Sequence, residues 1–299
     1  MPIPVLLAIS ISVALVSGIL RKHYSKTFPE NRVANQGLNL VVSLVATIVL
    51  ICWGGFSGWS WFTCLLALGF GIITGIQQVS NLKAMDFGPW SYTSVLISLS
   101  TLIPALSGVF IWGEDLHWAQ VVGMVLMVGC FICSVESKAD EKGASKKWIL
   151  WCMIAFLCTG MIGIMQKWHQ TSNFKGELNT FLILAFFVSC IYSSIFMFKI
   201  YRESKSSLDC FKEKEPKHLI WIVISMIMMG GAVAINNKLN LYLSGVMDSA
   251  VFFPLVNGGG LILTTLAAVV LFKEKLSVKQ WIGLIIGMVA VVFLCNPFV

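Results

Sequence analysis

Charged residues are scarce in this 299-residue sequence. They make up 12% of it, whereas 57% of the residues are hydrophobic. In soluble domains about a quarter of the residues are charged, so the composition excludes an ordinary soluble globular protein. The strict polar–apolar alternation of transmembrane strands is also missing, which leaves α-helices as the way to cross a membrane.

Long apolar runs take the place of the missing charge. A run of about 20 apolar residues spans the hydrocarbon core of a bilayer. The first run has no basic segment ahead of it and no small-residue cleavage site before Arg21, so we expect a retained helix and not a signal peptide. Ten such runs predict an all-α integral membrane protein, and they cover residues 3–20, 38–53, 61–82, 90–112, 118–135, 148–165, 180–200, 219–243, 246–272 and 278–295.

Carboxylates are missing from the middle of these runs. The acidic residues nearest to them lie at predicted helix ends: Asp86, Glu114, Asp115, Asp248 and Glu274. The sequence also has no recognisable hydrolase triad, metal site, phosphate-binding loop or nucleotide fingerprint. We therefore predict a protein that is not an enzyme, needs no cofactor or metal, and is not an ATP-driven pump. No loop is long enough to form a nucleic-acid-binding domain, so the expected surroundings are the lipid bilayer and a small-molecule substrate.

The placement of the basic residues predicts the orientation in the membrane. All 21 lysines and arginines, apart from Lys167, Lys175 and Lys238, lie in the odd-numbered loops between the runs or at the run ends next to them. Basic residues in short loops remain on the cytoplasmic side. With an even number of helices, both termini are then extracytoplasmic. We expect a bacterial plasma membrane as the location.

An internal repeat organises the ten runs. Residues 114–125 (EDLHWAQVVGMV) match residues 274–285 (EKLSVKQWIGLI) at a glutamate, a leucine, a glutamine and a glycine. Two shorter matches occur in the same order, between residues 18–23 and 163–169 and between residues 77–82 and 236–241. Five helices are an odd number, so the second copy runs through the membrane in the opposite direction, as in many secondary transporters. The predicted parts are residues 1–137, a basic linker at 138–147, and residues 148–299.

These doubled motifs resemble the drug/metabolite transporter superfamily, EamA type. Each half ends its third helix with Asn-Leu and opens its fifth with Glu-x-Leu followed by Gln-x-x-Gly. The resemblance covers essentially the whole chain. It implies export or exchange of small metabolites through a cavity lined by helices 1, 3, 4, 6, 8 and 9. Many members are thought to keep both termini in the cytoplasm, so the charge bias described above departs from the family.

The segment AINNKLNLYL at residues 234–243 places polar side chains inside an apolar run. Asn236, Asn237 and Asn240 share one face of the helix at 3.6 residues per turn. Lys238 points away from them. It is expected either to snorkel to the interface or to stand in the cavity as a fixed positive charge.

The matching segment of the first half carries amides at Gln77, Gln78 and Asn81. Amides in membrane helices either hold the bundle together by hydrogen bonds between helices or contact a substrate, and the sequence leaves both readings open. Amides offer donors and acceptors together. If they line a cavity, we expect a polar substrate, a class that includes zwitterionic solutes.

Two further segments complete the candidate site. Ser94 and Ser98 belong to a stripe of hydroxyl side chains in the fourth run. In the ninth run, PLVNGGG at residues 254–260 predicts a weakened or broken helix, because proline removes a backbone bond and glycine is flexible. Asn257 and Gly258 would line the cavity there. Close helix packing by small residues is the alternative.

The predicted function is a secondary transporter that moves a small polar, amino-acid-like metabolite by alternating access, as an exporter, exchanger or facilitator. A channel or a membrane protein without transport activity is the alternative. Amino acids, nucleosides, sugars and drugs all remain possible substrates, and the oligomeric state is left open.

Overall fold

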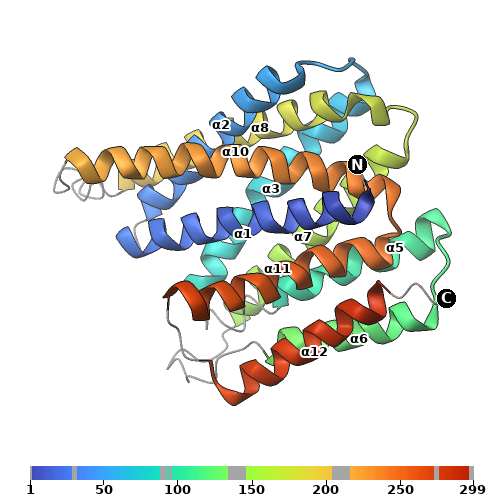
Figure 1. The fold of residues 1–299 in the computed structure, drawn as a ribbon. Helices are drawn as coiled ribbons and strands as arrows, with labels where there is room; N and C mark the ends of the chain where they lie inside the picture. The colour runs from blue at the N-terminus through green and yellow to red at the C-terminus, as the bar shows by residue number, and fades with distance from the viewer. Residues whose placement is uncertain are drawn as a thin grey trace. The chain divides into compact units, whose positions relative to one another are not determined.

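The structure is a computed structural model of the chain, and every regular element in its described part is a helix (Figure 1). No strand occurs there. The described residues are 2–28, 32–87, 93, 96–133, 146–203, 216–272 and 276–295.

Seven of the helices contain segments long and apolar enough to cross a bilayer. They are α1 (Ile3–Thr27), α2 (Arg32–Gly54), α3 (Trp61–Phe87), α7 (Lys146–Thr171), α8 (Leu178–Glu203), α10 (Pro216–Val246) and α11 (Ser249–Phe272). Three shorter apolar helical segments accompany them. These are Leu96–Trp112, which includes η1 (Leu99–Thr101) and α5 (Leu102–Trp112), α6 (Trp118–Cys133) and α12 (Val278–Leu294). A short turn, η2 (Lys175–Glu177), precedes α8.

The expected break in the ninth run is wrong. Helix α11 is continuous through Pro254 and the glycines that follow it. A proline removes a single backbone donor, and the surrounding turns keep their helical form. The glycines permit close approach instead, because a Cβ on Gly258 would clash with the side chain of Met127 on α6.

The chain forms two compact units, and each takes segments from both predicted halves. Unit 1 contains residues 1–75 and 172–240, and unit 2 contains residues 76–171 and 241–299. The unit boundaries fall inside α3 and α10. The two compact units therefore do not coincide with the two predicted halves of the repeat. The halves remain a sequence-based prediction. Most of the predicted linker at 138–147 lies outside the described residues.

In unit 1, α2 packs against α8. Nδ2 of Asn179, at the start of α8, donates to the carbonyl oxygens of Leu50 and Gly55 at the end of α2, at 3.0 and 2.6 Å. The start of one helix thus meets the end of the other, and the two are antiparallel. A buried apolar cluster, which includes Tyr24 and Met229, joins α1, α2 and α10.

In unit 2, α5 packs against α11 and α6 against α12. A Cβ on Gly123, early in α6, would lie 2.7 Å from Cγ of Leu294, the last residue of α12. A Cβ on Gly283, early in α12, would lie 2.7 Å from Cβ of Cys133, the last residue of α6. The contact is reciprocal and antiparallel, and both glycines permit it because a larger side chain has no room there.

The starts of α6 and α12 are capped by equivalent glutamines. The backbone N–H of His117 donates to Oε1 of Gln120 at 3.2 Å, and that of Ser277 donates to Oε1 of Gln280 at 2.9 Å. Ser277 also accepts a hydrogen bond from the backbone of Gln280, which completes a capping box. The glutamines that the repeat paired by sequence therefore perform the same local task.

Candidate functional site

The amides of α10 are bonded to α1 within unit 1. Nδ2 of Asn236 donates to the carbonyl oxygen and to Oγ of Ser10, at 2.9 and 3.1 Å. Oγ of Ser10 donates to Oδ1 of Asn240 at 2.6 Å, and Nδ2 of Asn240 donates to Oδ1 of Asn236 at 3.0 Å. These three side chains form a closed network, which corresponds to the bundle-holding reading of these amides.

Asn237 and Lys238 have other contacts. Nδ2 of Asn237 donates to the carbonyl oxygen of Val233 in its own helix at 2.9 Å. Nζ of Lys238 lies 4.3 Å from the ring centroid of Trp53 on α2, a distance typical of a cation–π contact. Asn237 is thus separated in its bonding from the Ser10 network, although it was predicted to share a face with Asn236 and Asn240.

The predicted amides of α3 belong to unit 2 and are bonded differently. Oε1 of Gln78 and Oδ1 of Asn81 are buried and have no hydrogen-bond partner among the described residues. Gln77 is half-buried on the same helix. The three side chains fall on one face of α3 at 3.6 residues per turn. A buried acceptor without a partner is uncommon and calls for an explanation, such as a bound water or ligand.

The remaining predicted residues also lie in unit 2. Ser94 falls outside the described residues, and Ser98 is half-buried immediately before η1. Nδ2 of Asn257 on α11 donates to Oγ1 of Thr101 at 3.2 Å and to the carbonyl oxygen of Phe253 at 2.9 Å. The structure therefore brings Asn257 to the turn that follows Ser98. Gly258 is buried against α6, as described above.

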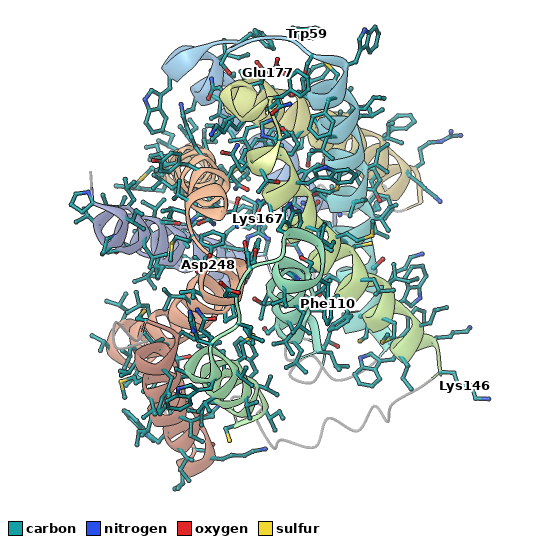
Figure 2. All side chains as sticks on the ribbon, turned by 90° about the vertical axis from the view of Figure 1, so that its right-hand side faces the viewer. Trp59, Phe110, Lys146, Lys167, Glu177 and Asp248 are labelled. Atoms are coloured by element: carbon teal, nitrogen blue, oxygen red, sulfur yellow. The ribbon has the colours of Figure 1, made fainter. Side chains whose placement is uncertain are left out.

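A buried ion pair in unit 2 was not predicted. Nζ of Lys167 on α7 lies 2.5 Å from Oε1 of Glu114, and the two side chains are 6% and 11% exposed. Nζ also donates to the carbonyl oxygen of Met247 at 2.9 Å, next to Asp248 in the turn before α11 (Figure 2). Glu114 in turn accepts from the backbone N–H of Ser249 at 2.7 Å. The pair joins α7, the segment after α5 and the start of α11.

The local backbone explains how Glu114 reaches Lys167. Helix α5 ends at Gly113, whose φ of 64° is in the left-handed region that favours glycine. The N–H of Glu114 then bonds back to the carbonyl oxygen of Gly108 at 3.1 Å. The chain reverses at this point, and the glutamate side chain is directed into the unit.

Two sequence signals could have identified the missed residues. Ser10 is a hydroxyl in the middle of an apolar run, and Lys167 is a cation two residues after the 148–165 run, on the side where the sequence places few basic residues. Both are costly in lipid without a polar partner. The identity of that partner depends on tertiary packing, so sequence periodicity alone could not supply it. Among the described residues, no cluster of three histidine, cysteine or acidic side chains could hold a metal ion.

Two segments of the chain match known protein families. Residues 3–135 match the EamA-like transporter family, and residues 203–286 match the Small Multidrug Resistance protein family. An uncharacterized protein of Haemophilus influenzae is 23% identical over 232 residues, which are 75% of this chain and 72% of that protein.

Two further similarities concern a bacterial transporter subunit and a solved structure. The probable 4-amino-4-deoxy-L-arabinose-phosphoundecaprenol flippase subunit ArnE of Hamiltonella defensa is 34% identical over 91 residues, 30% of this chain and 78% of that protein. A protein of known crystal structure matches with a TM-score of 0.72 and 14% identity, over 97% of this chain and 94% of that chain. At this identity the likeness concerns the fold alone.

Proposed function

Because the chain belongs to the EamA-like transporter family of the drug/metabolite transporter superfamily, we propose that it is a secondary transporter that moves a small polar metabolite by alternating access. The protein is an integral membrane protein with helices long enough to cross the bilayer. The substrate class and the mechanism are the proposal, and the residues below support it.

An inverted repeat of ten helices is the architecture we propose for this transporter. Seven helices are long enough to cross the bilayer, and we propose that the three shorter apolar segments cross it as well, which would give ten spans. Three pairs of helices in equivalent positions of the two predicted halves pack together: α2 with α8, α5 with α11, and α6 with α12. The reciprocal glycine contacts of α6 and α12 and their matching glutamine caps favour an antiparallel relation between the halves. Inverted repeats of this kind are typical of alternating-access carriers.

The observation that supports the proposed substrate class is a set of buried polar atoms on α3 without a partner among the described residues, which comprises Oγ1 of Thr74, Oε1 of Gln78, Oγ of Ser80 and Oδ1 of Asn81. Oε1 of Gln78 and Oδ1 of Asn81 have no partner among the described residues, and unpaired polar groups in a membrane helix are costly. A polar solute with a donor group, such as an amine, would satisfy them. We propose that Gln77 and Asn257 add to the same set of substrate contacts, and that Ser98 lies near Asn257.

We propose a structural role for the side-chain amides of Asn236 and Asn240 on α10. Asn236 and Asn240 hold α10 to α1 through Ser10, so a substrate would have to compete with bonds of 2.6–3.1 Å. We therefore assign them to positioning α10 and rank them below the α3 amides as substrate contacts. Their placement, and that of Ser94 and Asn237, on the walls of one cavity stays a prediction.

Transport by purified protein in liposomes tests the function. We expect uptake of a polar metabolite, from a panel of amino acids, nucleosides and sugars, to saturate with concentration and to accelerate when the same solute is present on the other side. Saturation and counter-exchange together identify a carrier. Flux that rises linearly and shows no exchange would identify a channel and contradict the proposal.

The absence of acidic residues from the middle of the predicted spans favours facilitated diffusion or exchange over proton coupling. Buried carboxylates are the usual proton carriers in transporters, and Glu114 is already paired with Lys167. We expect that a pH gradient alone does not drive uphill accumulation in the same liposomes. Accumulation against the substrate gradient under those conditions would show proton coupling.

A further inference from the structure

Helix α10 has two chemically different faces within unit 1. One face carries Asn236 and Asn240, which bond to Ser10. The other carries Gly231, Ile235 and Lys238, spaced four and three residues apart, so they fall on one stripe of the helix. Among the described residues, no carboxylate pairs with Lys238. The stripe thus combines small and apolar side chains with one cation at its end.

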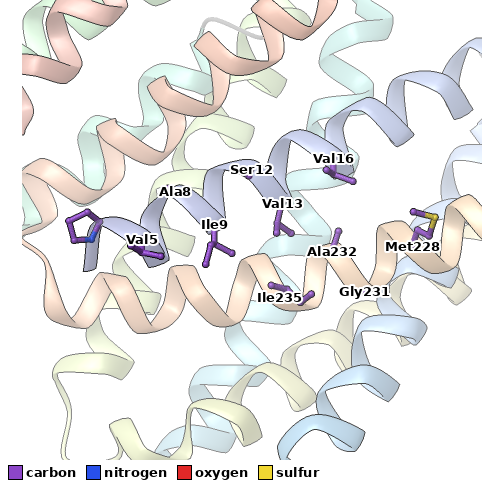
Figure 3. A pocket seen from close by; sticks show the side chains of 11 residues that line it. Val5, Ala8, Ile9, Ser12, Val13, Val16, Met228, Gly231, Ala232 and Ile235 are labelled. Carbon is purple, nitrogen blue, oxygen red and sulfur yellow. The ribbon is translucent and has the colours of Figure 1, made fainter. Parts of the chain in front are cut away.

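A groove of about 750 Å³ runs between this stripe and α1 (Figure 3). Its walls are apolar except for the hydroxyl of Ser12, and its α1 side includes Val5, Ile9 and Val16, which are 36–46% exposed. A Cβ added to Gly231 would meet nothing within 4 Å, so the groove is open at that point. Both helices span the membrane, so only hydrocarbon or another protein segment can fill it favourably.

A second groove of about 460 Å³ lies between α10 and α2 and shares Ile235 with the first. It is also lined by Trp53, whose ring lies beneath the ammonium group of Lys238. Tryptophan is enriched at the level of the lipid headgroups, and lysine extends its charge toward that level. The two apolar grooves therefore meet at Ile235, one turn from a cation and an aromatic ring, and both are residue types that favour a membrane interface.

We propose that α1, α10 and α2 bind one anionic phospholipid of the bilayer, with an acyl chain in the groove at Gly231 and the phosphate at Lys238. The second groove takes the other chain. Trp53 supports the ammonium group from below, and the outward side of that group faces the phosphate. The site lies outside the proposed substrate contacts on α3, and its test does not depend on transport.

Charge complementarity selects this occupant. A second copy of the chain would have to place a membrane helix in the groove and bring an acidic residue to Lys238. The carboxylates nearest the predicted runs lie at helix ends, such as Asp248, so the second copy would need a helix that fits the groove and also ends at the level of Lys238. A phospholipid supplies two apolar chains and a negative charge at the correct depth in one molecule. Each lysine near the surface contributes about a fivefold preference for anionic over neutral lipid.

Native mass spectrometry of the detergent-purified full chain, titrated with phosphatidylglycerol or phosphatidylcholine, tests this proposal. We expect the wild type to retain phosphatidylglycerol in preference to phosphatidylcholine. Lys238→Gln should lower phosphatidylglycerol binding about fivefold, to the level of phosphatidylcholine, and Lys238→Arg should keep the preference. Gly231→Leu should reduce the binding of both lipids, because its side chain fills the open groove without a clash.

Matched controls separate the site from general effects of charge and volume. Lys175→Gln removes an exposed lysine elsewhere in unit 1, and Gly129→Leu enlarges a glycine on α6, far from the groove in sequence and in the other unit. Neither should change lipid retention. Equal binding of the two lipids by the wild type, or full retention by Lys238→Gln or Gly231→Leu, would overturn the proposal. So would a dimer that Gly231→Leu dissociates, because a second copy would then occupy the groove.

Discussion

Asn236 and Asn81 carry the same amide, but their bonding differs. Asn236 uses its nitrogen and its oxygen within the Ser10 network, whereas Oδ1 of Asn81 has no partner among the described residues. A buried polar atom left unpaired destabilises the fold, whereas a paired one contributes to it. The two residues are therefore expected to respond in opposite ways to the same substitution.

Asn81→Leu should leave the melting temperature unchanged or raise it, because the substitution removes an unpaired acceptor. It should also raise KM about tenfold, since a lost hydrogen bond to a bound solute costs about 1–2 kcal/mol. Thermal unfolding in detergent and concentration-dependent uptake in liposomes measure the two effects.

Asn236→Leu is the matched comparison. It should lower stability by about 1–2 kcal/mol, because Ser10 and Asn240 both lose a partner in the membrane interior. If Asn81→Leu unfolds the protein and Asn236→Leu alters KM alone, the roles assigned to the two amides are reversed.

The Lys167–Glu114 pair gives a second prediction at the scale of residues. Lys167→Met leaves Glu114 buried without its counter-charge, and breaking such a pair costs about 3–5 kcal/mol. The double variant Lys167→Met, Glu114→Gln removes both charges and should recover part of that loss. The fraction of monodisperse protein after heating, compared across the single and double variants, provides the measurement. A double variant less stable than Lys167→Met would show that the charges do not act as a pair.

At the scale of elements, the apolar runs predicted the positions of the helices because lipid leaves the backbone no other way to satisfy its polar groups. The helix ends were less accurate. The second run was expected at 38–53, but α2 begins at Arg32, and Val33, Ala34 and Gln36 in its first turns are buried. Pro254 was overinterpreted because one missing donor does not end a helix whose neighbouring side chains, Phe252, Phe253 and Leu255, are buried.

Glycines on α3 provide the prediction at this scale. A Cβ on Gly71 would lie 2.7 Å from Cβ of Val188 and 3.0 Å from the carbonyl oxygen of Ala185, both on α8. Gly71→Ala should therefore force α3 away from α8 and lower stability by about 1–3 kcal/mol. Gly129→Ala is the control, because its Cβ would lie 3.8 Å from its nearest neighbour. Equal melting temperatures for the two variants would exclude a tight α3–α8 contact.

At the scale of the whole molecule, local sequence patterns predict fewer of the contacts than they do of the helices. The predicted repeat rests on matches such as Gln120 and Gln280, which cap helices in the same way, a task that depends on three neighbouring positions. The partners of Asn236 and Lys167 were not visible, because Ser10 lies 226 residues from Asn236 and Met247 lies 80 residues from Lys167. Polar residues inside apolar runs can thus be found from the sequence. The three-dimensional structure is needed to tell which of them bond to each other and which have no partner.

The orientation in the membrane is the prediction at this largest scale. From the loop charges we expect both termini to be extracytoplasmic and the 202–217 loop to be cytoplasmic. An alkaline phosphatase fusion after Val299 should be active, since that reporter requires the outside, whereas a fusion within the loop should be silent. Green fluorescent protein at the same two positions should give the opposite pattern. A C-terminal fusion that fluoresces would reverse the assigned orientation.

The unequal caps of α6 and α12 have a practical consequence for protein engineering. Ser277 and Gln280 form two reciprocal hydrogen bonds at the start of α12. At the start of α6 the equivalent residue is His117, whose backbone N–H donates to the side chain of Gln120. Each half of the chain can therefore serve as a template for improving the other. His117→Ser copies the serine of the second half into the first, and such exchanges offer a source of thermostabilised protein for experiments that need it in detergent.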